Sequence, residues 1–326
     1  MSSGDPRIAF ATPTGTRDVL PEELRELRGI TRAIEDCFAD AGYGEVRTPT
    51  LEHETPENAG LAAYRLIDEK GDTLVLRSDM TVPIARVALS RYGAQTAVLR
   101  FSYLERSWRR VKPHSGEGRE ILQAGAELIG AGSQGIAEIV QLCASALRAS
   151  GLNDWRLAVG DAGIIDSVLA DLDPAVGQDL REAVIDQDLV RVDAIAAESG
   201  AASIANLVRY RRPASEFETT WAEAGVSREA VSGLLELLAE LPEEIKSRVI
   251  VDLGLSSTLD YYSGFVFAVY DPAVGRSLGG GGSYDSLFAA AGSDLSGVGF
   301  ALDIDLLHQA LAARQGLRIA VDPLRV

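Results

Sequence analysis

Two long alternating segments restrict the fold of this chain more than any other feature. From Thr96 to Arg110, and again from Arg119 to Gly130, apolar and polar residues alternate with the period of two that a β-strand requires. The loop between them, Lys112 to Gly118, is rich in Pro, Ser and Gly. The sequence therefore predicts an antiparallel hairpin at this point.

The rest of the chain divides into a mixed part and a helical part. Expected helices span residues 21–41, 82–92 and 132–150, and expected strands span 44–52, 73–77, 155–160, 247–253, 265–270 and 296–305. Residues 61–72 are predicted to be helical or irregular. Because Pro49 cannot donate to a ladder, residues 44–52 are expected at a sheet edge, a bend or a subunit contact.

A shift in composition suggests an insertion. Residues 164–245 are rich in Ala, Leu, Glu and Asp, and they carry helical periodicity with few strand signals. We therefore predict an α+β fold, an antiparallel sheet flanked by helices. Its core would be discontinuous, residues 8–163 and 246–326, with a helical insertion at 164–245.

Two groups of polar residues are candidates for a binding site. Alternation places Gln123, Gly125 and Glu127 on one strand face, where burial would be costly without a ligand or partners. A solvated sheet face would explain them equally well. The second group is the turn Asp260–Gly264 (DYYSG), which puts a carboxylate and two phenols where a sheet meets a pocket. Alternatively, its tyrosines are amphipathic wall residues and Asp260 caps the turn.

Several other features argue against particular functions. A formal charge of -17 would repel a polyanion, so no nucleic-acid partner is expected, although Arg106–Lys112 could clamp a local anion. The glycine run Gly279–Gly282 lacks the Lys-Ser/Thr ending of a phosphate loop, and we expect it to let one backbone pass close to another or to a ligand. Asp303 and Asp305 alternate like strand residues without an evident catalytic partner.

Targeting segments, cysteines and histidines bear on the compartment and on cofactors. No basic leader and no apolar run of spanning length is present, so a cytoplasmic protein without membrane contact is expected. Cys37 and Cys143 lie on apolar helical stripes and are interpreted as core positions. The three histidines show no metal-ligand spacing, and we predict neither a metal nor a cofactor.

Ordered motifs over nearly the whole chain resemble those of class II aminoacyl-tRNA synthetases, specifically the histidyl branch. GEVRTPTLE resembles motif 1, LRSDMT resembles the LRPEGT segment, and WRRVKPHSGEGREILQAGAE resembles motif 2. LDYYSGFVF and GGGGSYD follow, and VGFALDIDLL resembles motif 3. In that family these motifs build one catalytic core, so the resemblance implies its fold.

The departures from that family concern the phosphate side of the site. Arg109 keeps the first motif 2 arginine, but Val111, Glu117, Ser257 and Leu306 replace residues that orient adenine or hold phosphates in the synthetases. Each lost charge-assisted contact would cost roughly 1.5 to 3 kcal/mol, so adenylation is expected to be lost. A synthetase would also continue into an anticodon-binding domain beyond the position of Val326.

The amino-acid side of the site is kept, which implies histidine binding without activation. The positions that match the histidine pocket are Asp79, Thr81, Arg109, Gln123, Glu127, Tyr261, Tyr262 and Tyr284. This combination resembles the regulatory subunits of ATP phosphoribosyltransferase, the first enzyme of histidine biosynthesis.

The resemblance to these regulatory subunits also implies an assembly. Dimers formed through the motif 1 region would join a short catalytic subunit in a hetero-octamer, support its activity and confer allosteric inhibition by histidine. Two alternatives stay open: a truncated synthetase-like enzyme that adenylates an amino acid, and a free-standing histidine sensor.

Overall fold

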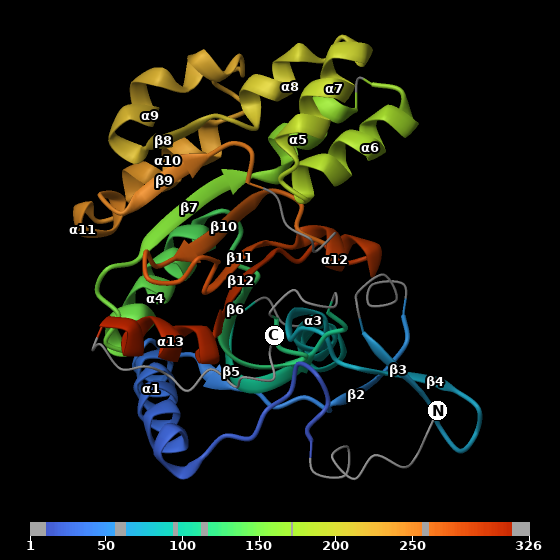
Figure 1. Ribbon diagram of the computed structural model, residues 1–326, viewed down its shortest axis with the longest axis vertical. Helices are drawn as coiled ribbons and strands as arrows, with labels where there is room; N and C mark the ends of the chain where they lie inside the picture. The colour runs from blue at the N-terminus through green and yellow to red at the C-terminus, as the bar shows by residue number, and fades with distance from the viewer. Residues whose placement is uncertain are drawn as a thin grey trace.

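The computed structural model describes residues 11–55, 63–93, 97–111, 117–170, 172–255 and 261–314. Within these residues nine strands form one mixed sheet in the order β1-β5-β6-β12-β11-β10-β7-β9-β8, and three strands form a small sheet, β2-β4-β3 (Figure 1). In chain order the elements are α1 (Pro21–Asp40), β1 (Gly44–Glu45), β2 (Leu51–His53), β3 (Tyr64–Ile67), β4 (Thr73–Leu76), α3 (Thr81–Val87), the π-helical turn η2 (Ala88–Tyr92), β5 (Leu99–Trp108), β6 (Glu120–Ile129), α4 (Gln134–Ala149), β7 (Arg156–Asp161), α5 (Ala162–Leu169), α6 (Pro174–Ile185), α7 (Leu189–Ser199), α8 (Ala202–Leu207), β8 (Arg211–Pro213), α9 (Ala214–Thr220), the 3₁₀ turn η3 (Trp221–Ala224), α10 (Ser232–Glu240), α11 (Glu243–Lys246), β9 (Val249–Asp252), β10 (Phe265–Tyr270), β11 (Gly279–Ser283), α12 (Asp285–Ala290), β12 (Gly297–Asp303) and α13 (Ile304–Arg314).

The predicted hairpin is confirmed. Strands β5 and β6 pair antiparallel along their whole length, from Leu99 opposite Ile129 to Trp108 opposite Glu120. On the other side of β6 the sheet continues through β12, β11, β10 and β7, and each successive pair from β6 to β7 is antiparallel. Strand β6 therefore lies in the interior of the sheet, and its side chains alternate between the two sheet faces.

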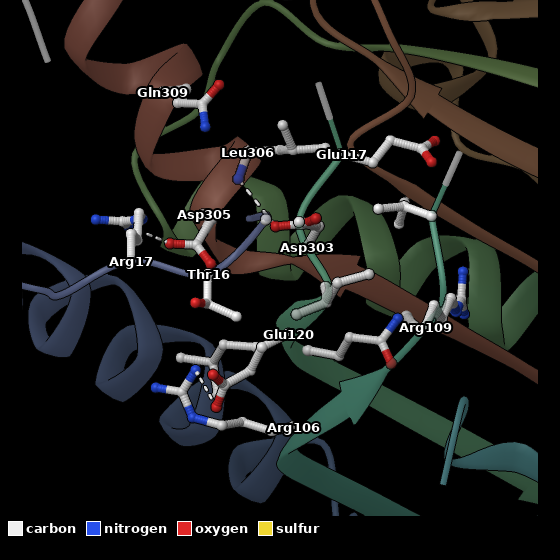
Figure 2. Close-up of a pocket in the computed structure, with 18 of the residues that line it drawn as sticks. Thr16, Arg17, Arg106, Arg109, Glu117, Glu120, Asp303, Asp305, Leu306 and Gln309 are labelled. Carbon is white, nitrogen blue, oxygen red and sulfur yellow. Dashed lines mark hydrogen bonds and ion pairs between the residues drawn. The ribbon is translucent and has the colours of Figure 1, made fainter. Parts of the chain in front are cut away.

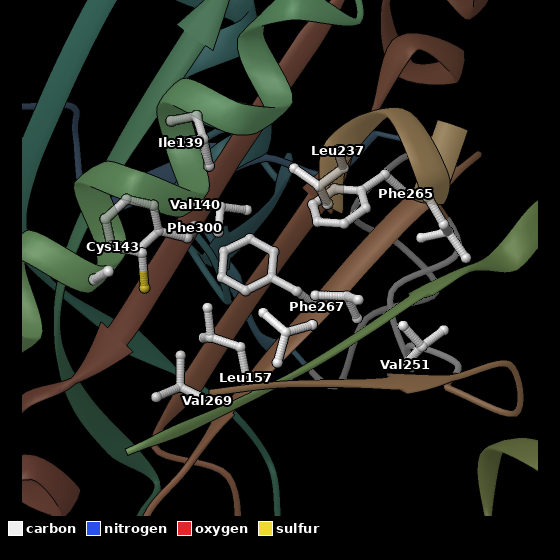
Figure 3. Close-up of a cluster of buried hydrophobic side chains, with 14 of the residues drawn as sticks. Ile139, Val140, Cys143, Leu157, Leu237, Val251, Phe265, Phe267, Val269 and Phe300 are labelled. Atoms are coloured by element: carbon white, nitrogen blue, oxygen red, sulfur yellow. The ribbon is translucent and has the colours of Figure 1, made fainter. Parts of the chain in front are cut away.

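One face of the sheet carries the main hydrophobic core. Helices α1, α4 and α13 pack against each other and against this face. Phe300 of β12 packs edge-on against Phe38 of α1, and Phe267 of β10 lies beside it (Figure 3). Cys143 is fully buried in this core, whereas Cys37 is half-buried and packs at its margin. Both thiols are free, and both fit the predicted positions on helix stripes.

The opposite face is covered by α3 and α12, which pack against each other. A second buried cluster forms there, and its members include Met80, Ile84, Tyr103, Tyr284 and Phe288. Met80 and Tyr284 come from segments that sequence analysis connected with ligand binding. The candidate polar residues therefore belong to this second face.

The helical segment leaves the sheet after β7 and returns at β9, two strands that pair in parallel. Figure 1 shows α5 to α9 on the far side of β7 and β9 from the β5–β6 hairpin. The helical prediction for this segment is right, but β8 was not expected: its three residues pair with β9 at the sheet edge, where Pro213 is tolerated. Leu237 of α10 packs in the same core as Phe267 (Figure 3). The division into a discontinuous core and a helical insertion at 164–245 stays a prediction.

Two local predictions need correction. Residues 44–52 form two strands, since β1 pairs in parallel with β5 whereas β2 belongs to the small sheet. The chain changes sheets near Pro49, where the buried Arg77 guanidinium donates to the Thr48 carbonyl at 2.7 Å and replaces the missing ladder. Residues 64–67, expected to be helical or irregular, form β3, because pairing with β4 overrides local propensity.

The glycine run forms β11, in the interior of the large sheet between β10 and β12. A Cβ built on Gly281 would lie 1.9 Å from the Gly299 carbonyl oxygen, and one on Gly280 would lie 2.4 Å from that of Phe267. The predicted close approach of two backbones is therefore confirmed.

A stability prediction arises from α1. Gly29 lies in the helix interior and is exposed, and a Cβ there would meet nothing within 4 Å. Gly29→Ala should raise the free energy of unfolding by about 0.5–1 kcal/mol, because alanine loses less backbone entropy in a helix. Urea denaturation checks this. Gly42→Ala is the matched control: its site is equally open, but a φ of +83° should make alanine destabilising by about 1 kcal/mol.

Candidate functional site

The candidate site lies where β6 faces α3 and α12. Ala124, Ala126 and Leu128 of β6 point into the main core, so Gln123 and Glu127 point to the opposite face with Gly125 between them. Both polar side chains are buried there. The solvated-face interpretation is therefore wrong, and these residues need partners.

The Glu127 side chain is only 1% exposed, and one of its two carboxyl oxygens has a hydrogen-bond partner in the described residues. Its Oε1 accepts a hydrogen bond from Thr81 Oγ1 at 2.9 Å, whereas Oε2 has no hydrogen-bond partner in the described part of the chain. The Tyr284 hydroxyl lies close enough to lower the carboxyl pKa without meeting hydrogen-bond geometry. Burial dominates and raises the pKa of Glu127 to about 8, so the carboxyl is mostly protonated at pH 7.

Asp79 is the second buried carboxyl of the site. Its Oδ1 accepts from the Val82 N–H at 3.0 Å, which helps to start α3, and Ser78 Oγ approaches Oδ2 at 3.4 Å. Burial raises its pKa, and the Arg109 guanidinium opposes that rise. Asp79 therefore has both a local structural role and a charged neighbour.

Phenols close the site. Tyr261 and Tyr262 make an edge contact with ring centroids 5.0 Å apart, and Tyr284 enters just before α12. Desolvation raises the pKa of all three, so they are neutral hydrogen-bonding groups at neutral pH. Asp260, also expected at this turn, lies outside the described residues.

Tyr103 belongs to this group, although sequence analysis missed it. It is buried on β5 directly opposite Gly125 of β6, and Glu127, Tyr262 and Asp79 all help to raise its pKa, after desolvation. The signal was present in the sequence: the alternation that selects Glu127 on one arm of the hairpin selects Tyr103 on the other.

Glycines provide the space in which these side chains lie. A Cβ on Gly299 would fall 1.8 Å from Glu127 Oε2, and one on Gly297 would fall 2.2 Å from the Tyr284 ring. Gly125 similarly accommodates the Tyr103 ring, with a Cβ distance of 2.4 Å to its Cζ. The sheet beneath the site therefore has to be bare backbone at these positions.

We call Asp79, Thr81, Glu127, Tyr262 and Tyr284 the glutamate cluster. Arg109 connects it to an adjacent cavity of 720 Å³: its Nε donates to the Ser78 carbonyl at 2.8 Å, and Arg109 and Gln123 both line the cavity (Figure 2). Of the predicted site residues, Gln123 and Arg109 are therefore at this junction, and the others gather around Glu127.

The replaced phosphate-side residues line the cavity. Val111 is in its wall, as are Glu117 and Leu306, which Figure 2 labels. Ser257 lies outside the described residues. The three described departures therefore line the cavity, and the residues of the glutamate cluster do not.

The charges of the cavity are nearly balanced. Its described lining holds five arginines and four acids. Arg17 pairs with Asp305 at 2.6 Å and with Glu23 at 2.6 Å, and Arg106 approaches Glu120 at 3.4 Å. Arginines held by carboxylates are poorly suited to bind a triphosphate, since the acids would repel it.

Asp303 and Asp305 have structural roles in the cavity wall. Asp303 Oδ1 accepts from the Leu306 N–H at 3.0 Å, and burial raises its pKa to about 6. Asp305 pairs with Arg17. These contacts account for both carboxylates without a catalytic pair.

The described residues offer neither a metal-binding cluster nor a membrane-spanning helix. No cluster of three or more His, Cys, Asp or Glu side chains is arranged to hold a metal ion. Among the described helices, none is long and apolar enough to span a membrane.

Sequence relatives identify the family of this chain. The sequence model of the histidyl-tRNA synthetase family matches residues 15–307. An ATP phosphoribosyltransferase regulatory subunit from Symbiobacterium thermophilum is 36% identical over 94% of this chain and 82% of its own length. One from Moorella thermoacetica is 35% identical over 92% of this chain and 82% of its own length.

Solved structures give the same result. A protein from Bacillus halodurans described as an ATP phosphoribosyltransferase regulatory subunit/histidyl-tRNA synthetase superposes with a TM-score of 0.83 and 29% identity, covering 93% of this chain and 83% of that one. A histidyl-tRNA synthetase from a Nostoc species, 17% identical with a TM-score of 0.72 over 95% of this chain and 77% of its own, shares the fold. The expected class II synthetase-like α+β fold is thereby confirmed, and the chain belongs to the family of ATP phosphoribosyltransferase regulatory subunits.

Proposed function

We propose that this regulatory subunit senses free histidine through the glutamate cluster. The observation that carries the proposal is a set of buried polar atoms without partners in the described residues: Gln123 Oε1, Glu127 Oε2 and the Tyr284 hydroxyl. Unsatisfied buried oxygens are costly unless a ligand supplies donors. An amino acid with an ammonium and an imidazole N–H supplies such donors.

In the proposed role the chain acts on a partner instead of catalysing a reaction of its own. The partner is a short ATP phosphoribosyltransferase catalytic subunit that depends on this chain for activity and for inhibition by histidine. Dimers formed through the motif 1 region would join catalytic subunits in a hetero-octamer in the cytoplasm. Membership of the regulatory-subunit family supports this assembly, and the net charge of -17 argues against nucleic acid as a partner.

Reconstitution tests the proposal. The full chain is mixed with a short catalytic subunit, and formation of phosphoribosyl-ATP is measured with and without L-histidine. Activity should appear only in the mixture and should fall as histidine is added. A catalytic subunit that is equally active alone, or a mixture that ignores histidine, would contradict the proposal.

One observation favours a second function. Arg109, the retained motif 2 arginine, still lines a cavity of 720 Å³ beside the glutamate cluster, as an adenylating enzyme would require. The carboxylate partners of Arg17 and Arg106 argue against it. We expect no histidine-dependent ATP–pyrophosphate exchange by the pure chain, and measurable exchange would favour the enzyme. A free-standing sensor would bind histidine but would neither co-purify with nor activate the catalytic subunit.

A further inference from the structure

The glutamate cluster and its neighbours contain more acid than base. The loop before α3 contributes Asp79 and β6 contributes Glu127. Among the described residues, Arg109 after β5 is the cation whose charge acts on Asp79 and on Tyr262. The other titratable groups that face Glu127 are phenols from three elements: Tyr103, Tyr261, Tyr262 and Tyr284. Strand β12 contributes only Gly299 beneath the carboxyl.

Contacts decide which acid carries the negative charge in the free protein. Asp79 accepts the Val82 N–H and approaches Ser78 Oγ, and the charge of Arg109 acts on it directly. Glu127 has only the Thr81 hydroxyl and the nearby Tyr284, and Asp79 repels its charged form. Two buried carboxylates whose charges repel each other are not both ionised readily. The charge of Arg109 therefore favours ionisation of Asp79, and Glu127 is the carboxyl that keeps its proton.

We propose that the site accepts a cationic nitrogen in exchange for the Glu127 proton, so that each bound ligand releases one proton to solvent. The inference rests on the proposed function, in which the ligand is histidine. The neutral carboxyl loses its proton to water, and the resulting carboxylate pairs with the ammonium group through the unpartnered Oε2. The ligand thus supplies the second cation that the site lacks.

Histidine affinity should increase with pH. The carboxyl pKa of about 8 in the free protein is lowered by the bound cation, so binding strengthens as pH rises towards 8 and levels off above it. Between pH 7 and pH 8 the ligand should bind about fivefold more tightly. In this interval the imidazole of free histidine, with a pKa of about 6.5, is mostly neutral and its ammonium stays protonated, so the change comes from the protein.

Calorimetry of the full chain with L-histidine at pH 7 tests the proposal. The apparent enthalpy should differ between phosphate and Tris buffers by the difference in their ionisation enthalpies multiplied by nearly one proton. Equal enthalpies in the two buffers together with a flat Kd between pH 7 and pH 8 would overturn the inference while leaving histidine binding intact. Failure of histidine to bind at any pH would instead overturn the proposed function.

Infrared difference spectroscopy identifies the group that releases the proton. Histidine should remove a protonated-carboxyl C=O band from the wild-type spectrum, and this band should already be absent from free Glu127→Gln. Glu236→Gln, an exposed substitution of the same kind on α10, should behave as wild type. If the band persists in Glu127→Gln and still responds to histidine, another carboxyl supplies the proton and the assignment is wrong.

Discussion

Glu127→Gln is expected to weaken histidine binding by about 3 kcal/mol, roughly 150-fold in Kd, because the ligand cation would lose its buried carboxylate partner. The free protein should lose little stability. Glutamine has the shape of the protonated acid, and its Oε1 can still accept the Thr81 hydrogen bond. In a reconstituted complex this variant should still activate the catalytic subunit while responding poorly to histidine.

Calorimetry gives the Kd for this variant and urea denaturation gives its stability. Glu236→Gln, on the exposed face of α10, is the matched control and should change neither quantity. Wild-type affinity in Glu127→Gln would show that the ligand does not pair with this carboxyl, and histidine would have to bind elsewhere.

Gly299→Ala is expected to reduce both stability and binding. Its Cβ would lie 1.8 Å from Glu127 Oε2 and 2.7 Å from the Ala126 carbonyl oxygen, so the carboxyl has to leave its position and the ladder has to shift. Overpacking of this kind should lower the free energy of unfolding by about 3 kcal/mol. Gly233→Ala in α10, where a Cβ meets nothing within 4 Å, is the control and should not destabilise the protein.

A double-mutant cycle separates the two contacts of that new methyl group. In a Glu127→Ala background the clash with the carboxyl is gone, so Gly299→Ala should cost about 1–2 kcal/mol less than in the wild type. Additive effects would show that the backbone contact at Ala126 dominates, and that the glycine is required by the sheet and not by the glutamate.

Much of this fold could be predicted because the hairpin and its covering helices follow from local periodicity. The alternation of β6 alone placed Gln123 and Glu127 on one face, and the structure places them there. Local sequence patterns gave the wrong secondary structure where pairing with a neighbouring strand determines it. The segment Tyr64–Ile67 is a strand because β4 lies beside it, and residues 44–52 divide between two sheets because Arg77 binds the backbone at Thr48.

The sequence predicted which residues belong to the candidate site but not which of them contact each other. The resemblance supplied Asp79, Thr81 and the tyrosines, yet nothing in the sequence shows that Thr81 donates a hydrogen bond to Glu127 over 46 positions or that the charge of Arg109 acts on Asp79. Those contacts depend on how α3 docks on the sheet. The glycines Gly297 and Gly299 leave room for Tyr284 and Glu127, but sequence analysis did not connect them with these side chains.

The backbone of β6 and β12 forms the floor of the glutamate cluster, and this limits how the subunit could respond to its ligand. Rotamer changes cannot reshape Gly125, Gly297 or Gly299, and the strands that carry them are fixed by neighbours on both sides. The floor is therefore rigid, and little entropy is lost there when a ligand arrives. Any displacement that carries a signal outwards has to pass through the roof, which is made by α3 and by the segments that bring Tyr262 and Tyr284.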